Sequence, residues 1–404
     1  KTILGEWTAE ALRDLTGDAK QLRRPIVKGF SVLRDATGLI EGELACGKQV
    51  IVAHGPPLSG VTNVLSQVAC SESLGPALYV EAHAGKDILQ WIANRLMRET
   101  GVSISKGSLR QWFSGTRGLV KIVIIIDGMP EKEALDELID WARGGHFQLV
   151  IGASTETYRK ARSLPGKNQD TPLGLVATAV VIGQLSDSEF SRAVDLYFST
   201  FNAVFAQGAT FASDLRLVST HRFIAASLPP GKDSPAGAAI VMPAILGPDS
   251  LAPYNSAFVT DPHQRMRLQK LANIYLKEFE KRIGEPGWIS GTWGFPSVSA
   301  SLAEKAFDKE EIRSLEEQGF LSMISTAREE FRLLIRVERI FAHYIAQKWC
   351  EDLCSMKKRP AVERRLEQLV SSASAIPDGL IALAAAVART AGRRDDILST
   401  VTNY

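Results

Sequence analysis

Between residues 25 and 185, short runs of valine and isoleucine alternate with helical stretches, and this alternation constrains the fold more than any other feature of the chain. Runs this short and this apolar are typical of strands that are buried on both faces of a parallel sheet. Their alternation with helices predicts right-handed crossovers and a doubly wound α/β domain. The predicted strands are Gln49–Ala53, Ala77–Glu81, Lys121–Ile126, Gln148–Ile151 and Ala179–Ile182, and the clearest helices are Asp87–Thr100 and Glu133–Arg143.

The segments on either side of this region are mainly helical in pattern. Ser186 and Glu189 have the spacing of a capping box and predict a helix that runs through Phe201. Farther on, helices are followed by two strands and a closing helix, which is the order of elements in a winged helix. The predicted domains are an N-terminal helix and linker (1–24), the α/β domain (25–185), a helical lid and loop (186–262), a winged-helix-like domain (263–355) and C-terminal helices (356–404).

Composition restricts the classes of function without selecting one. The 47 basic and 45 acidic side chains leave a net charge of +2, which gives no general argument for binding nucleic acid. No window has the roughly 18 apolar residues that cross a bilayer, so no membrane association is expected. The four cysteines are spread thinly, which indicates reduced thiols and a cytoplasmic protein.

The segment after the first predicted strand has the spacing of a phosphate-binding loop. Its two glycines stand five residues apart, as in the Walker A pattern, and Thr62 occupies the place of the hydroxyl that binds magnesium. A helix, Asn63–Cys70, follows, so that backbone N–H groups and the helix N-terminus would face an anion. The residues of this candidate site are Gly55, Pro56, Pro57, Leu58, Ser59, Gly60, Val61 and Thr62.

One position departs from the pattern, because Val61 stands where a lysine would reach the β- and γ-phosphates. A valine neither donates a hydrogen bond nor neutralises charge, and losing such a contact costs on the order of a thousandfold in rate. The loop is therefore expected to hold ATP or ADP weakly through its backbone, or no nucleotide, and the chain is not expected to be an efficient ATPase. An ordinary Gly/Pro turn in a Rossmann-like fold is the structural alternative.

An acid follows the third predicted strand. Asp127 ends this run as the acid of a Walker B segment does, and its carboxylate would hold Mg²⁺ together with Thr62. Asp127-Gly128 resembles the strand ending of STAND-class ATPases, the signalling switches related to AAA+ proteins. In most members of that class the sequence continues with further acidic residues, one of which polarises the attacking water. In this chain the resemblance leaves Glu131 for that role. A turn residue or helix N-cap is the alternative for Asp127.

Two further positions fit the same resemblance in chain order. Ser154, near the end of the fourth predicted strand, resembles the sensor 1 residue, whose hydroxyl touches a γ-phosphate. Arg216 stands where a lid helix would offer a sensor arginine. The alternatives are a common strand-ending hydroxyl and a solvated surface arginine.

Segments outside the predicted sheet extend the resemblance. Arg24–Arg34 is similar to the entry motif that precedes the first strand in STAND and AAA+ ATPases, and Leu315–Leu321 and Phe341–Ala346 are similar to their winged-helix ending. The resemblance covers roughly residues 22–350. It implies a parallel-sheet P-loop NTPase core, a helical lid and a winged-helix domain that serve regulated assembly.

Three hypotheses about function follow. The first is a catalytically degenerate STAND/AAA+ module that acts as a regulatory switch or scaffold, with protein partners or self-assembly. The second is an atypical active ATPase in which Lys48, Lys86 or a neighbouring subunit's lysine replaces the missing charge. The third is a DNA-associated AAA+ adaptor of the initiator or transposition type, against which the acidic helix Lys309–Gln318 argues.

Overall fold

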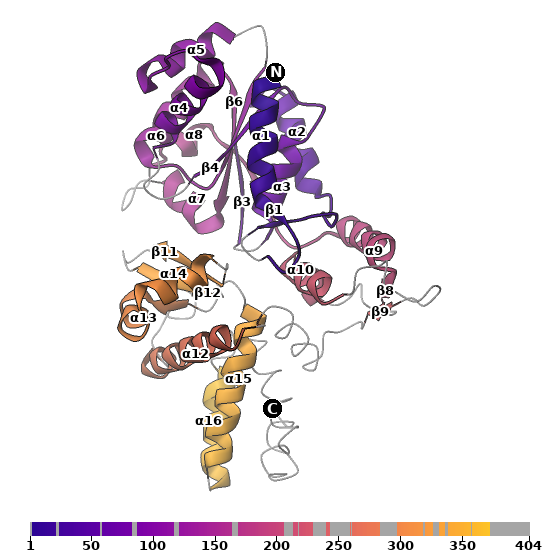
Figure 1. Cartoon of the computed structure of the whole chain (residues 1–404), viewed down its shortest axis with the longest axis vertical. Coiled ribbons are helices and arrows are strands. Elements are labelled where there is room, and N and C mark those ends of the chain that lie inside the picture. The colour runs from indigo at the N-terminus through magenta and orange to yellow at the C-terminus, as the bar shows by residue number, and fades with distance from the viewer. Residues whose placement is uncertain are drawn as a thin grey trace. The chain divides into compact units, whose positions relative to one another are not determined.

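The computed structural model divides the chain into two compact units, which are described separately (Figure 1). The first comprises residues 1–18, 24–221 and 230–242, and the second comprises residues 19–23, 222–229 and 243–404. The structure describes residues 2–21, 24–56, 59–82, 87–116, 121–163, 169–205, 213–216, 218–228, 240–242, 259, 261–282, 297–317, 320–325, 331–335, 338–356 and 358–371. Within those ranges, no helix combines the length and the apolar character needed to cross a bilayer.

A five-stranded sheet, parallel throughout, forms the centre of the first unit, with the strand order β4-β5-β6-β3-β7. The doubly wound α/β sheet predicted from the apolar runs is confirmed, and the ends of the strands differ from the predicted ones by three residues at most. The strands are β3 (Val50–Gly55), β4 (Ala77–Glu81), β5 (Val123–Asp127), β6 (Gln148–Ser154) and β7 (Thr178–Val181).

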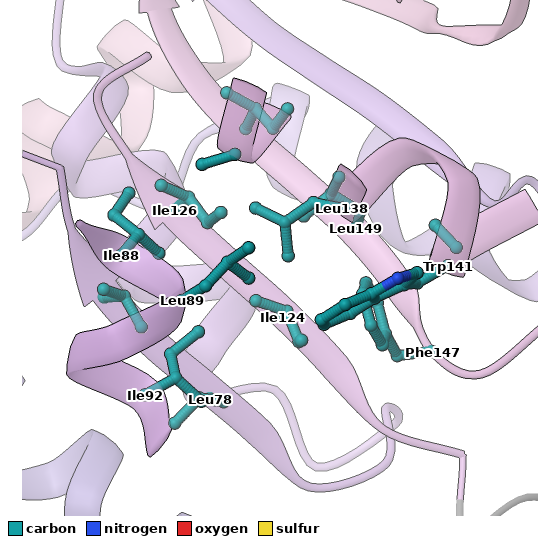
Figure 2. Close-up of a cluster of buried hydrophobic side chains, with 14 of the residues drawn as sticks. Leu78, Ile88, Leu89, Ile92, Ile124, Ile126, Leu138, Trp141, Phe147 and Leu149 are labelled. Atoms are coloured by element: carbon teal, nitrogen blue, oxygen red, sulfur yellow. The ribbon is translucent and has the colours of Figure 1, made fainter. Parts of the chain in front are cut away.

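Both faces of the sheet are buried along β3 to β6, because alternate residues of these strands contact different helices, whereas the edge strand β7 buries only Val180. On one face, Val52 and Ile124 pack with the helices that follow β4, β5 and β6, and Figure 2 shows this cluster. On the other face, Ile51 and Ile125 pack with α2 and α3. Each such side chain contributes about 1.5–3 kcal/mol when fully buried. The helices are α2 (Asp35–Ala45), α3 (Val61–Ala69), α4 (Ile88–Thr100), α5 (Leu109–Thr116), α6 (Lys132–Arg143), α7 (Thr155–Arg162) and α8 (Pro172–Val176), and a short 3₁₀ turn, η1 (Lys106–Ser108), precedes α5.

Helix α1 (Thr2–Leu15) covers the β4 edge of the sheet (Figure 1). The Thr8 hydroxyl donates to the carbonyl of Ala77 at 2.6 Å and accepts from the N–H of Tyr79 at 3.2 Å. One side chain thereby satisfies two backbone groups that an edge strand otherwise leaves open. The helix occupies the first part of the predicted N-terminal segment, and its Leu4 and Trp7 are buried against the sheet.

A helical segment follows the sheet within the first unit. Helix α9 (Asp187–Phe201) opens with the predicted capping box, in which Ser186 accepts from the N–H of Glu189 and Glu189 accepts from the N–H of Ser186. Most of residues 228–262, the last part of the predicted lid and loop segment, lies outside the described residues. The other elements are β1 (Thr16–Gly17), β2 (Ile26–Val27), β8 (Ala203–Phe205), η3 (Ser213–Arg216) and β9 (Ile240–Met242), with β1 parallel to β2 and β8 parallel to β9. Helix α10 (Val218–Ser227) begins in the first unit, and its residues from Arg222 on belong to the second.

The second unit contains helices and a three-stranded antiparallel sheet in the order β10-β12-β11. Arg332 in its central strand is buried and donates to Glu278 Oε1 at 2.7 Å, which ties the sheet to α12. Residues 372–404, part of the predicted C-terminal helices, lie outside the described residues. The elements are α12 (Pro262–Arg282), β10 (Ser297–Ser299), α13 (Ala300–Ala306), α14 (Lys309–Glu317), β11 (Leu321–Ser325), β12 (Phe331–Ile335), α15 (Glu338–Ser355) and α16 (Arg359–Ser371).

Candidate phosphate-binding site

The carboxyl ends of β3 and β6 form a topological switch point. These strands are neighbours, and Gly55 pairs with Ser154 at their ends. The chain leaves β3 through α3, which packs on one face of the sheet, and leaves β6 through α7, which packs on the other. In open parallel sheets, ligands bind in the crevice outside such a pair of strands. The predicted loop is located at this point of the fold.

Two glycines shape the loop, each for a steric reason. A Cβ atom on Gly55 would lie 2.2 Å from the carbonyl oxygen of Ile182 and 2.4 Å from the Ser59 hydroxyl, so this position requires a glycine. Gly60 adopts a left-handed conformation, with φ 92°, and is the N-cap of α3. Helix α3 therefore begins at Val61, two residues before the predicted start. Pro56 is exposed, whereas Pro57 and Leu58 lie outside the described residues.

The N-terminus of α3 has no side-chain cap, because its N-cap residue is Gly60. The N–H of Val64 is the first in the helix to bond within it, to the carbonyl of Gly60 at 3.0 Å. Beside this turn, the hydroxyl of Ser59 is buried and has no hydrogen-bond partner among the described residues. Unsatisfied N–H groups at a helix N-terminus attract anions, and a buried hydroxyl without a partner adds a donor.

The side chain at the lysine position lies against the sheet. A Cβ atom built on Gly152 of β6 would lie 2.9 Å from Cγ1 of Val61, 2.5 Å from Cδ1 of Leu65 and 3.3 Å from Oδ1 of Asp127. Val61 and the Walker B acid thus both contact the space above one glycine. The structure brings together the residue that departs from the Walker A pattern and the predicted magnesium ligand.

Asp127 has a buried partner that the sequence analysis missed. The hydroxyl of Tyr79, a fully buried residue on β4, donates to Asp127 Oδ2 at 2.8 Å. Burial, and then the charges of Asp127 and Glu81, raise the pKa of Tyr79 well above its usual value, so the phenol keeps the proton that it donates. Thr62, the other predicted magnesium ligand, is half-buried in the first turn of α3.

The other predicted site residues have structural contacts of their own. Ser154 pairs with Gly55 in the sheet, and its hydroxyl caps α7 by accepting from the N–H of Thr157 at 3.0 Å. Glu131 is the exposed N-cap residue of α6 and makes no side-chain capping bond. Arg216 donates to Asp187 Oδ1 at 2.6 Å, and its guanidinium carbon lies 4.8 Å from the centre of the Phe190 ring.

A buried arginine beside the loop was also missed as a site residue. The Arg34 side chain is 4% exposed and donates from Nη1 to the carbonyl oxygen of Ser59 at 2.9 Å. The same Nη1 would lie 3.2 Å from a Cβ atom on Gly60, so the guanidinium packs against the loop. The one feature of the sequence that could have indicated its burial is that Arg34 directly follows the largely apolar stretch Phe30–Leu33. Its partners lie far along the chain and could not be identified from that stretch.

Lys48, one of the lysines proposed as substitutes, does not fill the position of Val61. Lys48 precedes β3, and its carbonyl accepts from Gln148 at the amino end of the sheet, opposite the loop. Lys86 lies outside the described residues. His54, near the end of β3, stacks its ring on that of Tyr158, with the ring centres 4.7 Å apart. Burial lowers the pKa of His54.

Neither a protein-family model nor a curated protein sequence matches the chain. Among solved structures, it is similar to a signal transduction ATPase with numerous domains (STAND) protein with a tetratricopeptide repeat sensor from Pyrococcus horikoshii, at 11% identity and a TM-score of 0.29 over 91% of this chain and 57% of that one. A Walker-type ATPase of Pyrococcus abyssi matches at 10% identity and a TM-score of 0.37, over 76% of this chain and 94% of that one.

A structure of Pif1 helicases on forked double-stranded DNA matches at 12% identity and a TM-score of 0.23, over 42% of this chain and 48% of that one. The chain spans little more than half the length of the STAND protein. Likenesses this weak carry no argument about activity. The chain's own geometry is that of a doubly wound α/β fold, and its parallel five-stranded sheet with a glycine-framed loop between β3 and α3 is consistent with an α/β P-loop NTPase core.

Proposed function

We propose that this chain is a nucleotide-binding module of the STAND/AAA+ type that holds the phosphates of ADP or ATP without hydrolysing them efficiently. Its role is that of a regulatory switch or scaffold that acts with protein partners or further copies of itself. The observation that carries the proposal is the pairing of an uncapped helix N-terminus with an apolar residue at the lysine position.

Binding of a phosphate group is supported by the donors that surround the loop. The left-handed Gly60 turns the chain so that the first N–H groups of α3 point out of the helix end. The hydroxyl of Ser59, which has no hydrogen-bond partner among the described residues, lies beside them. These groups are neutral, and backbone donors of this kind hold phosphate oxygens in many nucleotide-binding loops.

Slow or absent hydrolysis is supported by the environment of Val61. Its side chain contacts the space above Gly152, and no cation occupies its place in the sequence. Removing a single group that stabilises the transition-state charge costs about a hundredfold to a thousandfold in rate. Glu131, the residue left for polarising water, is exposed at the start of α6.

Magnesium fits the donors that are present. Mg²⁺ in nucleotide sites is usually held by one or two protein oxygens together with phosphate oxygens and water. Asp127 supplies a carboxylate and Thr62 a hydroxyl, and the Tyr79 bond leaves Asp127 Oδ1 on the side of Val61. When bound, the ion would offset phosphate charge that the chain itself does not neutralise.

Titration of the purified chain with ADP and ATP, with and without magnesium, tests the proposal. We expect saturable binding that is weakened by Asp127→Asn and Thr62→Ala, and turnover near the background rate. A chain that binds neither nucleotide contradicts the nucleotide role. Brisk hydrolysis that Asp127→Ala abolishes contradicts the degenerate role and favours the atypical active ATPase.

A further inference from the structure

The phosphate loop is joined to helix α9 by one buried ion pair. Arg34 uses all three nitrogens of its guanidinium, donating from Nε to Glu189 Oε1 at 2.9 Å, from Nη1 to the carbonyl of Ser59 at 2.9 Å and from Nη2 to the carbonyl of Gly183 at 2.8 Å. The single guanidinium of Arg34 therefore contacts the loop, the segment after β7 and the first turn of α9 at the same time.

Both carboxylate oxygens of Glu189 also accept hydrogen bonds. Oε1 accepts from the N–H of Asp35 at 2.7 Å as well as from Arg34, and Oε2 accepts from the N–H of Ser186 at 2.8 Å. Both side chains of the pair are 4% exposed. Separating two buried charges leaves each without compensation, so the contacts of this pair are expected to form and break together rather than one by one.

The loop cannot change its conformation without involving this pair. The carbonyl of Ser59 and the α-carbon of Gly60 form the surface on which Nη1 rests, and Gly60 sets the start of α3. A phosphate group bound by the first N–H groups of α3 would reorient the peptide units on either side of Gly60. The oxygen that accepts from Arg34 belongs to one of those units.

We propose that Arg34 is a positioning residue which, through Glu189, couples the phosphate loop to the first turn of α9. The inference rests on the proposed function, because it identifies how occupancy of that site is transmitted. Ligand at the loop stabilises the Arg34 contact with Ser59, and α9 is held more firmly as a result. When two sites are coupled in this way, occupancy of one typically changes the affinity of the other by about 5-fold to 150-fold.

Hydrogen exchange of the full chain, followed by mass spectrometry with and without ADP and Mg²⁺, tests this coupling. In the wild type, we expect ADP to slow exchange in the first turns of both α3 and α9, the latter by on the order of tenfold. In Glu189→Gln, ADP should still protect α3, while the protection of α9 falls to near the unliganded level. Arg34→Lys keeps the charge but not the three-way geometry, and should give an intermediate result even if Glu189→Gln does not fold.

Arg192→Gln is the matched control. Arg192 also joins α9 to the entry segment, donating to the carbonyl of Leu33 at 3.0 Å and to Asp35 Oδ1 at 2.5 Å. It is partly exposed, however, and makes no hydrogen bond or ion pair with the described residues of the loop. Its loss should speed exchange in α9 with and without ADP and leave the response to ADP intact. If this variant and Glu189→Gln abolish the response equally, Arg34 has no special coupling role.

The outcomes separate this inference from the proposed function. Protection of α3 by ADP without any response of α9 in the wild type overturns the coupling and leaves nucleotide binding in place. If ADP protects neither helix, the nucleotide role fails. Hydrogen exchange of the wild type and Glu189→Gln without ligand then tests the coupling by itself. In that case Glu189→Gln must speed exchange in both first turns relative to wild type, and an effect limited to α9 overturns the coupling.

Discussion

The hydroxyl of Tyr79 donates a 2.8 Å hydrogen bond to Asp127, which links two adjacent strands at the carboxyl end of the sheet. The tyrosine is completely buried, and the carboxylate oxygen that accepts the bond is the one that does not face Gly152. The bond therefore orients the acid that the proposed magnesium site requires.

Replacing Tyr79 with phenylalanine should destabilise the chain by about 1–3 kcal/mol, because the carboxylate loses its buried donor while the ring remains in place. Guanidinium unfolding of Tyr79→Phe, Asp127→Asn and the double variant measures this. A coupling energy of about 0.5–3 kcal/mol between the two sites is expected. Strictly additive effects would show that the bond contributes nothing.

Restoring the lysine should strengthen nucleotide binding. A hydrogen bond to a charged group contributes about 1.5–3 kcal/mol, so Val61→Lys is expected to raise the affinity for ADP about tenfold or more. To reach a phosphate, the lysine side chain has to point away from the space above Gly152, which Val61 contacts in the wild type. Calorimetric titration checks the gain, with Val61→Met as a control of similar length and no charge. Equal affinities of the two variants would mean that the loop does not face phosphate.

Adding a methyl group at Gly152 should destabilise the sheet. The new Cβ would lie 2.5 Å from Leu65 and 2.9 Å from Val61, and overpacking of this kind costs about 1–3 kcal/mol. Gly183→Ala is the matched control, since a Cβ there meets nothing within 4 Å. Denaturant unfolding should place Gly152→Ala well below the control, and combining it with Val61→Ala should restore part of the loss. Similar stability of both glycine variants is the contrary outcome.

The stability of the chain should fall as the solution is acidified from about pH 6.5 to pH 4. Burial lowers the pKa of His221 to about 4, against the opposing effect of the Leu215 carbonyl, which its ring contacts at 2.6 Å. In this window the unfolded chain takes up a proton that the folded chain does not, which removes about 3 kcal/mol of stability. Above pH 6.5 both states are neutral at this residue and the effect is absent.

Unfolding free energies measured at several pH values in wild type and His221→Gln check this loss. The glutamine does not titrate, so the difference between the two proteins should shrink, or change sign, as the pH is lowered. A constant difference from pH 7 to pH 4 would show that His221 does not cause the acid sensitivity.

The strands, most of the helices and the loop between β3 and α3 were predictable from the sequence. Strands buried on both faces need consecutive apolar residues, and β3 to β6 show that requirement directly as short apolar runs. The capping box of Ser186 and Glu189 was visible for a similar reason, since its hydrogen bonds join residues three apart. Val61 could be recognised as a departure because the Walker A pattern fixes each residue by its distance from the next.

Partners that are distant in the chain were decided by the tertiary structure alone. Arg34 meets Glu189 across 155 residues, and Tyr79 meets Asp127 across 48, because the order of strands in the sheet brings their ends together. Arg216 was predicted as a sensor arginine from its place in the chain, and its ion pair with Asp187 could not be read from that place. The local pattern of apolar residues indicates whether a residue is buried. Which distant residue it contacts depends on the order in which the crossover connections place the strands.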